Sequence, residues 1–422
     1  MLDKVLFKNI SALFSINVAG YIIPLVTLPY LVRVLGPEGY GTLAFSLAII
    51  QYFIIIVRYG FDLSITRKIA RCKNDKNRTS LIFWNVITTR LIIAATGFVI
   101  LFVLVNFFES MAPLEEALFC SYIMVMGVAL FPQWLFQGKE QLGRISTFRI
   151  VLQVINIPLI IIFVNDSSDI WVAALVNSAP HFLIVLVAIF IIYHRKWISW
   201  RRPSIEGIYK EVKDGWHLFI SMAAINFYTT STTVILGIIA GPTSVALYTS
   251  ANKLLKAAQG LSSPISSSFF PRINSLMKTN KLEALNLIRY LMKIQLGVTA
   301  ITCIGLFVFA PIVVNLLFGP GYERSVGILR ILSILPIIIG VADVLANHVL
   351  LSYGYKKEFS NVYIKCGLIS IVILVPLTYC FDAEGAAISV VIIEALVTLL
   401  MYFMVKKKQI PLFKTKVKVE NV

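Results

Sequence analysis

Long apolar segments, separated by short polar stretches, follow one another along the whole sequence of 422 residues. An α-helix needs about 20 mainly apolar residues to cross about 30 Å of hydrocarbon, and these segments reach that length. The stretches between them are too short for a separate soluble domain. The pattern therefore predicts an all-α membrane protein with about twelve transmembrane helices, at residues 10–32, 41–61, 81–105, 117–137, 146–164, 170–192, 216–239, 244–267, 290–317, 325–350, 360–380 and 385–405.

Short motifs near the first six predicted helices recur near the last six. The dipeptide Gly-Pro after the first helix recurs after the seventh, 205 residues later, and an arginine after the second helix recurs at the same offset. The segments FQGKEQ and SYGYKK, after the fourth and tenth helices, are also alike. Halves with six helices each enter the membrane in the same sense, so a pseudo-two-fold axis along the membrane normal would relate them.

This symmetry predicts two six-helix lobes around a central cavity. We expect the N-terminal lobe at 1–200, including part of a basic link, the C-terminal lobe at 201–405, and a basic cytoplasmic tail at 406–422. A cleft between two such bundles is the natural place for a substrate.

Composition and charge agree with a membrane protein. Hydrophobic residues make up 58% of the chain and charged residues 14%, with a formal net charge of +17 and a mean hydropathy of +0.84. Most of the 38 lysines and arginines lie in alternate loops and in the tail, whereas the opposite loops hold only Arg33 and Arg324. By the positive-inside rule both termini are cytoplasmic, and the net charge needs no nucleic-acid partner.

Residue types that would indicate an enzyme or a metal site are sparse. The five cysteines lie mainly in or beside apolar segments, which is typical of small core residues, and the four histidines are scattered. The sequence has no nucleotide-binding P-loop, no HExxH zinc motif and no GxSxG nucleophile motif. It therefore predicts a transporter rather than an enzyme, without a metal or another cofactor.

Three basic residues fall deep inside predicted helices. Arg90 lies about ten residues into its helix, or about 15 Å, and Lys253 lies at a similar depth with Lys256 one turn further on. A cation at the centre of a spanning helix costs about 2.5–3.5 kcal/mol on insertion scales, so it faces water or protein. Because Asn252 shares the polar face of the same helix as the lysines, we expect these cations to line an aqueous cavity.

Hydroxyl and amide side chains form polar stripes on several other predicted helices. One such stripe holds Arg149, Gln153 and Asn156. A polar lumen would produce these stripes, and so would hydrogen bonds between packed helices, which favour the same residue types. At the level of sequence both interpretations stand.

Acidic residues inside the predicted helices are fewer than basic ones. Asp62 follows Arg58 by four residues, the spacing of an ion pair along one helix face, so a local Arg58–Asp62 pair is expected. Glu394 near the middle of the last helix, and Asp343 toward the cytoplasmic end of the tenth, are the candidates for ion coupling. The excess of cations suits an anionic substrate.

Three segments resemble a known family. They are 16–70, which contains LVRVLGPEGYGTLAFSLAIIQYFIIIVRYGFD; 132–146, PQWLFQGKEQLGRIS; and 247–274, LYTSANKLLKAAQGLSSPISSSFFPRIN. Together they resemble the bacterial O-antigen flippases, which are polysaccharide exporters of the superfamily that also holds the multidrug and toxin extruders and the lipid II flippases. The resemblance covers nearly the whole chain and is most specific in the first segment.

The resemblance implies a substrate, partners and a location. The substrate would be an oligosaccharide linked through pyrophosphate to undecaprenol, and its polyprenyl tail would stay in membrane lipid in the bacterial inner membrane. An O-antigen polymerase and a chain-length regulator are implied as candidate partners. On this basis the pyrophosphate or acidic sugars would meet a cationic cavity at Arg58, Arg90, Lys253 and Lys256, with Asn252 beside them.

Three other functions compete with a flippase. A multidrug exporter of the same fold needs buried carboxylates for cationic drugs, and the helix at 10–32 holds none. An O-antigen polymerase or ligase needs a large outer loop, whereas the outer loops here are about a dozen residues or shorter, and a scaffold leaves the buried cations unexplained. The sequence favours a flippase that moves the lipid-linked oligosaccharide to the periplasmic leaflet by alternating access.

Overall fold

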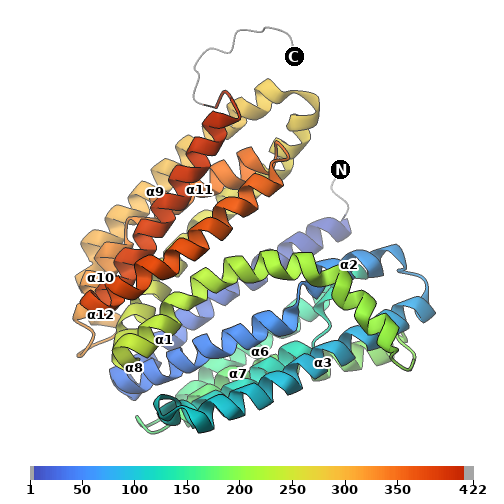
Figure 1. Ribbon diagram of the computed structural model, residues 1–422, viewed down its shortest axis with the longest axis horizontal. Coiled ribbons are helices and arrows are strands. Elements are labelled where there is room, and N and C mark those ends of the chain that lie inside the picture. The colour runs from blue at the N-terminus through green and yellow to red at the C-terminus, as the bar shows by residue number, and fades with distance from the viewer. Residues whose placement is uncertain (1–3, 413–422) are drawn as a thin grey trace. The chain divides into compact units, whose positions relative to one another are not determined.

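The computed structural model describes the backbone of residues 4–412. Helices make up nearly all of this range, and it contains no strand, so the predicted all-α class is confirmed (Figure 1). The elements are α1 (Lys4–Arg58), α2 (Phe61–Arg71), α3 (Lys76–Phe107), η1 (Glu109–Leu114), α4 (Glu115–Leu130), α5 (Gln133–Gly138), α6 (Leu142–Phe163), α7 (Ile170–His194), α8 (Ile205–Thr279), α9 (Lys281–Leu317), α10 (Arg324–Leu332), α11 (Leu335–Asp343), the π-helix η2 (Val344–Leu350) and α12 (Lys356–Lys407).

Nine helical segments of the described range are long and apolar enough to cross a membrane. Three of the helices contain residues with non-helical backbone angles: Gly36 in α1, Gly241 in α8, and Phe381 with Asp382 in α12. Each of these positions falls in a turn that the sequence predicts between two spans. The chain is therefore a multi-pass membrane protein, and the count of twelve spans stays a prediction.

The contacts within the chain divide it into two compact units. Unit 1 is Met1–Ala246 and unit 2 is Leu247–Val422. In unit 1, α4 packs against α1 and α7, and α6 packs against the same two helices. In unit 2, α9 and α12 both pack against α10 and α11, and Figure 1 shows α9, α11 and α12 running side by side.

Glycines permit the closest helix contacts of unit 1. A Cβ atom on Gly41 of α1 would lie 1.9 Å from the Pro242 carbonyl oxygen, and one on Gly127 of α4 would lie 2.3 Å from the His181 carbonyl oxygen of α7. No real Cβ atom approaches another backbone so closely, so glycine is required for these helices to touch. The Gly127 contact holds α4 and α7 together beside the polar pocket described below.

Two helix breaks in unit 1 differ from the predicted spans. The helix predicted at 41–61 ends at Arg58, because Tyr59 and Gly60 have left-handed backbone angles, with φ of 44° and 70°. The helix predicted at 117–137 stops at Leu130, because Pro132 has no N–H to continue it. Both breaks leave backbone carbonyl groups and helix ends inside the unit.

Buried aromatic side chains fix the short helices that follow these breaks. Phe61 of α2 and Trp134 and Phe136 of α5 are fully buried in one hydrophobic cluster. Burying a large apolar side chain contributes about 1.5–3 kcal/mol. The cluster therefore holds the first turn of α2 and the end of α4 at fixed positions, and the polar side chains of the pocket project from these two places.

Candidate functional site

A polar pocket lies inside unit 1 and takes side chains from six helices. Its lining includes charged and polar residues from α1, α2, α3, α5, α6 and α7 and the backbone at the end of α4. The polar side chains are those of Arg58, Asp62, Arg90, Gln133, Arg149, Gln153 and His181. We call this site the arginine pocket, after Arg58, Arg90 and Arg149.

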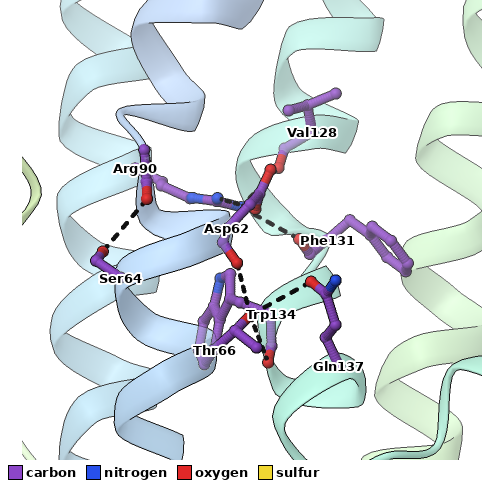
Figure 2. Close-up of polar contacts among 9 residues, drawn as sticks. Asp62, Ser64, Thr66, Arg90, Val128, Phe131, Trp134 and Gln137 are labelled. Atoms are coloured by element: carbon purple, nitrogen blue, oxygen red, sulfur yellow. Dashed lines mark hydrogen bonds and ion pairs between the residues drawn. The ribbon is translucent and has the colours of Figure 1, made fainter. Parts of the chain in front are cut away.

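Arg90 of α3 is held on several sides and is only 1% exposed. One terminal nitrogen, Nη2, donates to the Asp62 carboxylate at 2.8 Å, and the other, Nη1, donates to the carbonyl oxygens of Val128 at 3.4 Å and Phe131 at 3.3 Å. Figure 2 shows the guanidinium pointing toward these three acceptors. The Phe61 ring lies 5.7 Å from the guanidinium carbon and closes another side.

One carbonyl acceptor of Arg90, that of Val128, lacks a backbone donor because α4 ends there, whereas the Phe131 carbonyl also accepts from the Gln133 N–H at 3.0 Å. In a continuous helix the Val128 carbonyl would accept from the N–H of residue 132, but that residue is proline. The last carbonyls of a helix also carry the negative end of its dipole. A guanidinium therefore supplies both the missing donor and a compensating charge at this helix end.

The predicted ion pair between Arg58 and Asp62 is not the one that the structure contains. Asp62 pairs with Arg90, at 2.8 Å. A spacing of four residues brings two side chains together only along a continuous helix. The break at Tyr59 and Gly60 turns Asp62 into the first turn of α2 and away from the last turn of α1.

The pocket has an excess of positive charge. The charges of Arg90 and Asp62 cancel, while Arg58 and Arg149 make no hydrogen bond or ion pair among the described side chains. Gln153 Oε1 and His181 Nδ1 are buried without a hydrogen-bond partner in the same part of the chain. With a neutral His181, the net charge of the lining is +2, which favours an anion.

The pocket is narrow in this conformation. Its volume is about 30 Å³, and a buried water needs about 10–15 Å³ on the same scale. The pocket therefore has room for about two or three water molecules between its side chains. A larger anion would have to reach the arginines from the edge of the pocket or widen it.

The other predicted site residues lie in unit 2. On α8, Asn252 and Lys253 are half-buried and Lys256 is exposed. Glu394 is half-buried on α12, and Asp343 at the end of α11 accepts a hydrogen bond from the Asn347 amide at 2.5 Å. Their predicted roles in substrate binding and ion coupling stay predictions, as do those of Arg58 and Arg90.

Five of the seven polar side chains of the pocket are not assigned to a site by the sequence: Asp62, Gln133, Arg149, Gln153 and His181. Asp62 pairs with Arg90 instead of Arg58, and Arg149 with Gln153 is visible in the sequence only as part of a polar stripe. The stripe of Arg149 and Gln153, one turn apart on α6, was the available signal, since both side chains line the pocket. His181 gave no signal, because its neighbours come from other helices.

Gly127→Ala is expected to destabilise unit 1 by about 1–3 kcal/mol, the usual cost of overpacking. The added methyl group would meet the backbone of His181 and Phe182, so α4 and α7 would have to separate beside the acceptors of Arg90. The melting temperature of the purified protein would measure the loss. Gly305→Ala is the matched control, because nothing lies within 4 Å of a Cβ atom there, and equal melting temperatures for both variants would contradict the expectation.

Comparisons with known proteins place the chain in a family. A family model described as "Polysaccharide biosynthesis protein" matches residues 6–277. A protein of Escherichia coli strain K12 named "Putative O-antigen transporter" is 35% identical over 416 residues, which is 96% of this chain and 97% of that protein. A protein of Shigella dysenteriae with the same name is 29% identical and is covered over its full length, with 94% of this chain aligned.

Solved structures show the same fold at low sequence identity. The lipid II flippase MurJ, in an inward closed conformation, matches with a TM-score of 0.78 and 11% identity over 94% of this chain and 87% of that one. An inward-facing multidrug resistance transporter of the MATE family matches with a TM-score of 0.71 and 18% identity over 96% of this chain and all of that one. The two transporters share the fold of this chain, and the chain itself belongs to the polysaccharide biosynthesis protein family, together with the O-antigen transporters that it resembles in sequence.

Proposed function

We propose that this protein carries undecaprenyl-pyrophosphate-linked O-antigen units from the cytoplasmic to the periplasmic leaflet of the inner membrane. The arginine pocket carries this proposal. It places two guanidinium groups, of Arg58 and Arg149, inside a helical membrane unit, and neither has a hydrogen bond or an ion pair among the described residues. A lipid-linked diphosphate is an anion that is already in the membrane, and its sugar and lipid parts need no charged contacts.

The chemistry of arginine suits this substrate. The planar guanidinium donates in a fork that matches phosphate oxygens, and it keeps its charge when it leaves water. Arg58 and Arg149 would contact the diphosphate, while Arg90, whose donors already serve Asp62 and the end of α4, would hold the pocket in shape. The polyprenyl chain would remain in lipid, so the pocket would carry only the charged diphosphate across the membrane.

Three pairs of structural features, each 205 residues apart, support two lobes with an internal repeat. They are the kink glycines Gly36 and Gly241, the helix-capping residues Asp75 and Asn280, and the buried polar residues Arg90 and Gln295. Both glycines have positive φ with ψ of 179°, and both capping side chains accept from the backbone N–H three residues on. Random similarity would not repeat a kink, a cap and a buried polar position at one offset.

This repeat supports the finer architecture proposed here. Twelve spans would form six-helix lobes at 1–200 and 201–405, related by a pseudo-two-fold axis along the membrane normal, and the tail at 406–422 would be cytoplasmic. The concentration of lysine and arginine on one side of the predicted spans supports a cytoplasmic position for both termini. Rocking of the lobes would then expose the substrate to each leaflet in turn.

A multidrug exporter is the second candidate, since a transporter of that class shares the fold. A cationic drug needs an available carboxylate inside the membrane. Among the described residues that line the arginine pocket, the only carboxylate is that of Asp62, and it is held by Arg90 at 2.8 Å. The charge of the pocket therefore favours an anionic substrate over a cationic drug.

Complementation tests the proposed function. In a strain that lacks its own O-antigen flippase but makes O-units that this protein accepts, the wild-type chain is expected to restore O-antigen on the cell surface. Surface immunolabelling with a matched immunoblot of membrane protein would measure it. Drug resistance without surface O-antigen, at normal protein levels, would favour the exporter and overturn the proposal.

A further inference from the structure

The chain is held in the same way where it leaves α7 and where it leaves α12. After α7, Trp84 of α3 donates its indole N–H to the Ser199 carbonyl oxygen at 3.1 Å. After α12, Arg289 of α9 donates its Nε–H to the Leu412 carbonyl oxygen at 2.8 Å. Arg289 lies 205 residues after Trp84, which is the offset of the repeat proposed above. Side chains at equivalent positions therefore hold the segments that follow α7 and α12.

The turns that end these two helices also match. Lys196 and Gln409 both have left-handed backbone angles, with φ of 51° and 54°. At each turn the N–H groups of three consecutive residues, 195–197 and 408–410, make the same pattern of hydrogen bonds to the last turn of the helix. Gln409 lies 213 residues after Lys196, and the two carbonyl acceptors named above are the same distance apart. The two segments are therefore equivalent parts of the repeat, and the larger offset reflects the longer stretch from α9 to α12 in unit 2.

In unit 1 the chain then continues across α2 and α3. The Ser204 N–H donates to Asn85 Oδ1 of α3 at 3.1 Å, and a Cβ atom on Gly207 would lie 2.2 Å from the amide nitrogen of the same asparagine. At the start of α8, Glu211 pairs with Lys68 of α2 at 2.5 Å. The segment after α7 therefore covers both helices and joins them.

The corresponding surface of unit 2 is an open groove between the end of α8 and the start of α9. Tyr290 in this groove lies 205 residues after Asn85 and is 58% exposed, whereas Asn85 is 6% exposed beneath the covering segment. The volume of the groove is about 520 Å³, within the range of about 300–1,000 Å³ that ligand pockets have. Its lining includes Phe269 and Arg272 of α8 and Glu283, Asn286, Leu287 and Tyr290 of α9. We call it the α8–α9 groove.

The α8–α9 groove combines apolar surface with one charge of each sign. The rings of Phe269 and Tyr290 lie 6.4 Å apart, and Leu287 is half-buried beside them. Glu283 and Arg272 are exposed in the same lining. Large exposed apolar patches mark places where something binds. A suitable occupant has an aromatic or aliphatic side chain with charged groups on either side of it.

The sequence supplies such an occupant next to the groove. Ten residues, FKTKVKVENV, follow Leu412 and alternate apolar residues with lysines over most of their length. Leu412 is 4% exposed and is held by Arg289, whose Nη1 also donates to Asn286 Oδ1 in the groove at 3.0 Å. Phe413 therefore starts at the edge of the groove. In unit 1 the segment reaches α3 at Ser204, only a few residues after its own clamp, so ten residues are enough to cross α9.

The base of this segment is attached to unit 2 at several further points. Arg289 Nη2 donates to the Pro411 carbonyl oxygen at 2.6 Å, and the Ile410 side chain is 8% exposed. Lys408 pairs with Glu358 at 2.7 Å and lies 4.5 Å from the centre of the Tyr355 ring. A short tether from a fixed point gives an effective concentration of about 1 mM. A weak interaction is therefore enough to fill the groove.

We propose that residues 413–422 dock in the α8–α9 groove and join α8 to α9, as the equivalent segment joins α2 to α3 in unit 1. Phe413 is equivalent to Trp200, whose ring packs on that of Trp84 with a distance of 4.5 Å between the ring centres. It would cover the apolar surface, and the lysines that follow would lie beside Glu283. The proposal rests on the internal repeat and not on the substrate, so failed complementation would refute the flippase and leave this docking standing.

Chemical labelling tests whether the segment covers the groove. Tyr290→Cys is made in the full chain and in a chain that ends at Leu412, and both proteins react with a water-soluble maleimide in lipid nanodiscs. We expect position 290 to react about tenfold more slowly in the full chain, a difference of 1.4 kcal/mol, as read by mass spectrometry of the labelled peptide. Lys278→Cys is the matched control, because Lys278 is exposed on α8 outside the groove, and it should react equally in both chains.

A peptide separates docking from an indirect effect of shortening the chain. The peptide FKTKVKVENV, added at about 1 mM to match the tethered segment, is expected to restore slow labelling at position 290 in the shortened chain, whereas a scrambled peptide should not. Fast labelling in both chains would show an empty groove, and slow labelling in both would show that lipid covers it. Either result, or a peptide without effect, would overturn the proposal.

Discussion

Asp62→Ala is expected to deplete folded protein from the membrane, because it leaves the Arg90 guanidinium buried without its carboxylate. Arg90 is 1% exposed and holds Asp62 at 2.8 Å. Removing one partner of a buried ion pair costs about 3–5 kcal/mol, a large share of the roughly 5–15 kcal/mol that keeps a domain folded. The yield of monodisperse protein and its melting temperature in detergent would measure the effect.

A double variant tests whether the loss of stability in Asp62→Ala comes from the unpaired charge of Arg90. Asp62→Leu together with Arg90→Leu removes both charges, and apolar replacement of a whole buried pair is often close to neutral. We expect this variant to recover most of the stability that Asp62→Ala loses, apart from a cost of about 1 kcal/mol for the Val128 carbonyl left without its donor. A melting temperature of Asp62→Ala equal to that of the wild type would contradict the structural role of the pair.

Arg58→Ala together with Arg149→Ala is expected to abolish transport while the protein stays folded. Neither arginine has a hydrogen bond or ion pair to lose among the described residues, and the double change takes the net charge of the pocket from +2 to zero. A hydrogen bond to a charged group contributes about 1.5–3 kcal/mol. Losing two of them would weaken the hold on the diphosphate about a hundredfold or more, since 1.4 kcal/mol is a factor of ten.

The matched control for this variant is Arg71→Ala together with Arg78→Ala. Both of these arginines are exposed, at the end of α2 and the start of α3, and their removal lowers the net charge of the protein by the same amount. We expect transport in the control to equal that of the wild type. Arg58→Lys with Arg149→Lys should keep part of the activity, because lysine preserves the charge but not the fork of donors.

The sequence predicted the class of fold because hydropathy acts over whole segments. Runs of apolar residues long enough to span a bilayer must become helices, since lipid offers the backbone no hydrogen-bond partners. The Gly-Pro positions at 36–37 and 241–242 marked two of the kinks, because glycine tolerates the positive φ found there. Where one segment determines its own structure, the prediction was sound.

The candidate site was harder to predict from the sequence, because helices from different parts of the chain form it. Arg90 was identified by its depth in the membrane and Arg58 by the resemblance to the flippases, and the structure places both in the arginine pocket. The prediction that Asp62 pairs with Arg58 was wrong, because it assumed a continuous helix through Tyr59 and Gly60. One acceptor of Arg90 is the Val128 carbonyl, which has no helical donor because residue 132 is proline, and no side-chain pattern encodes a contact between α3 and the end of α4.

Transport in liposomes tests the central role of the arginine pocket most directly. Purified protein is reconstituted with an undecaprenyl-pyrophosphate-linked oligosaccharide, and a membrane-impermeant lectin reports how fast the sugar changes leaflets. We predict rapid exchange with the wild type and with Arg71→Ala plus Arg78→Ala, and only the protein-free rate with Arg58→Ala plus Arg149→Ala. Exchange at the wild-type rate in the Arg58 and Arg149 double variant, at equal reconstituted protein, would contradict the account.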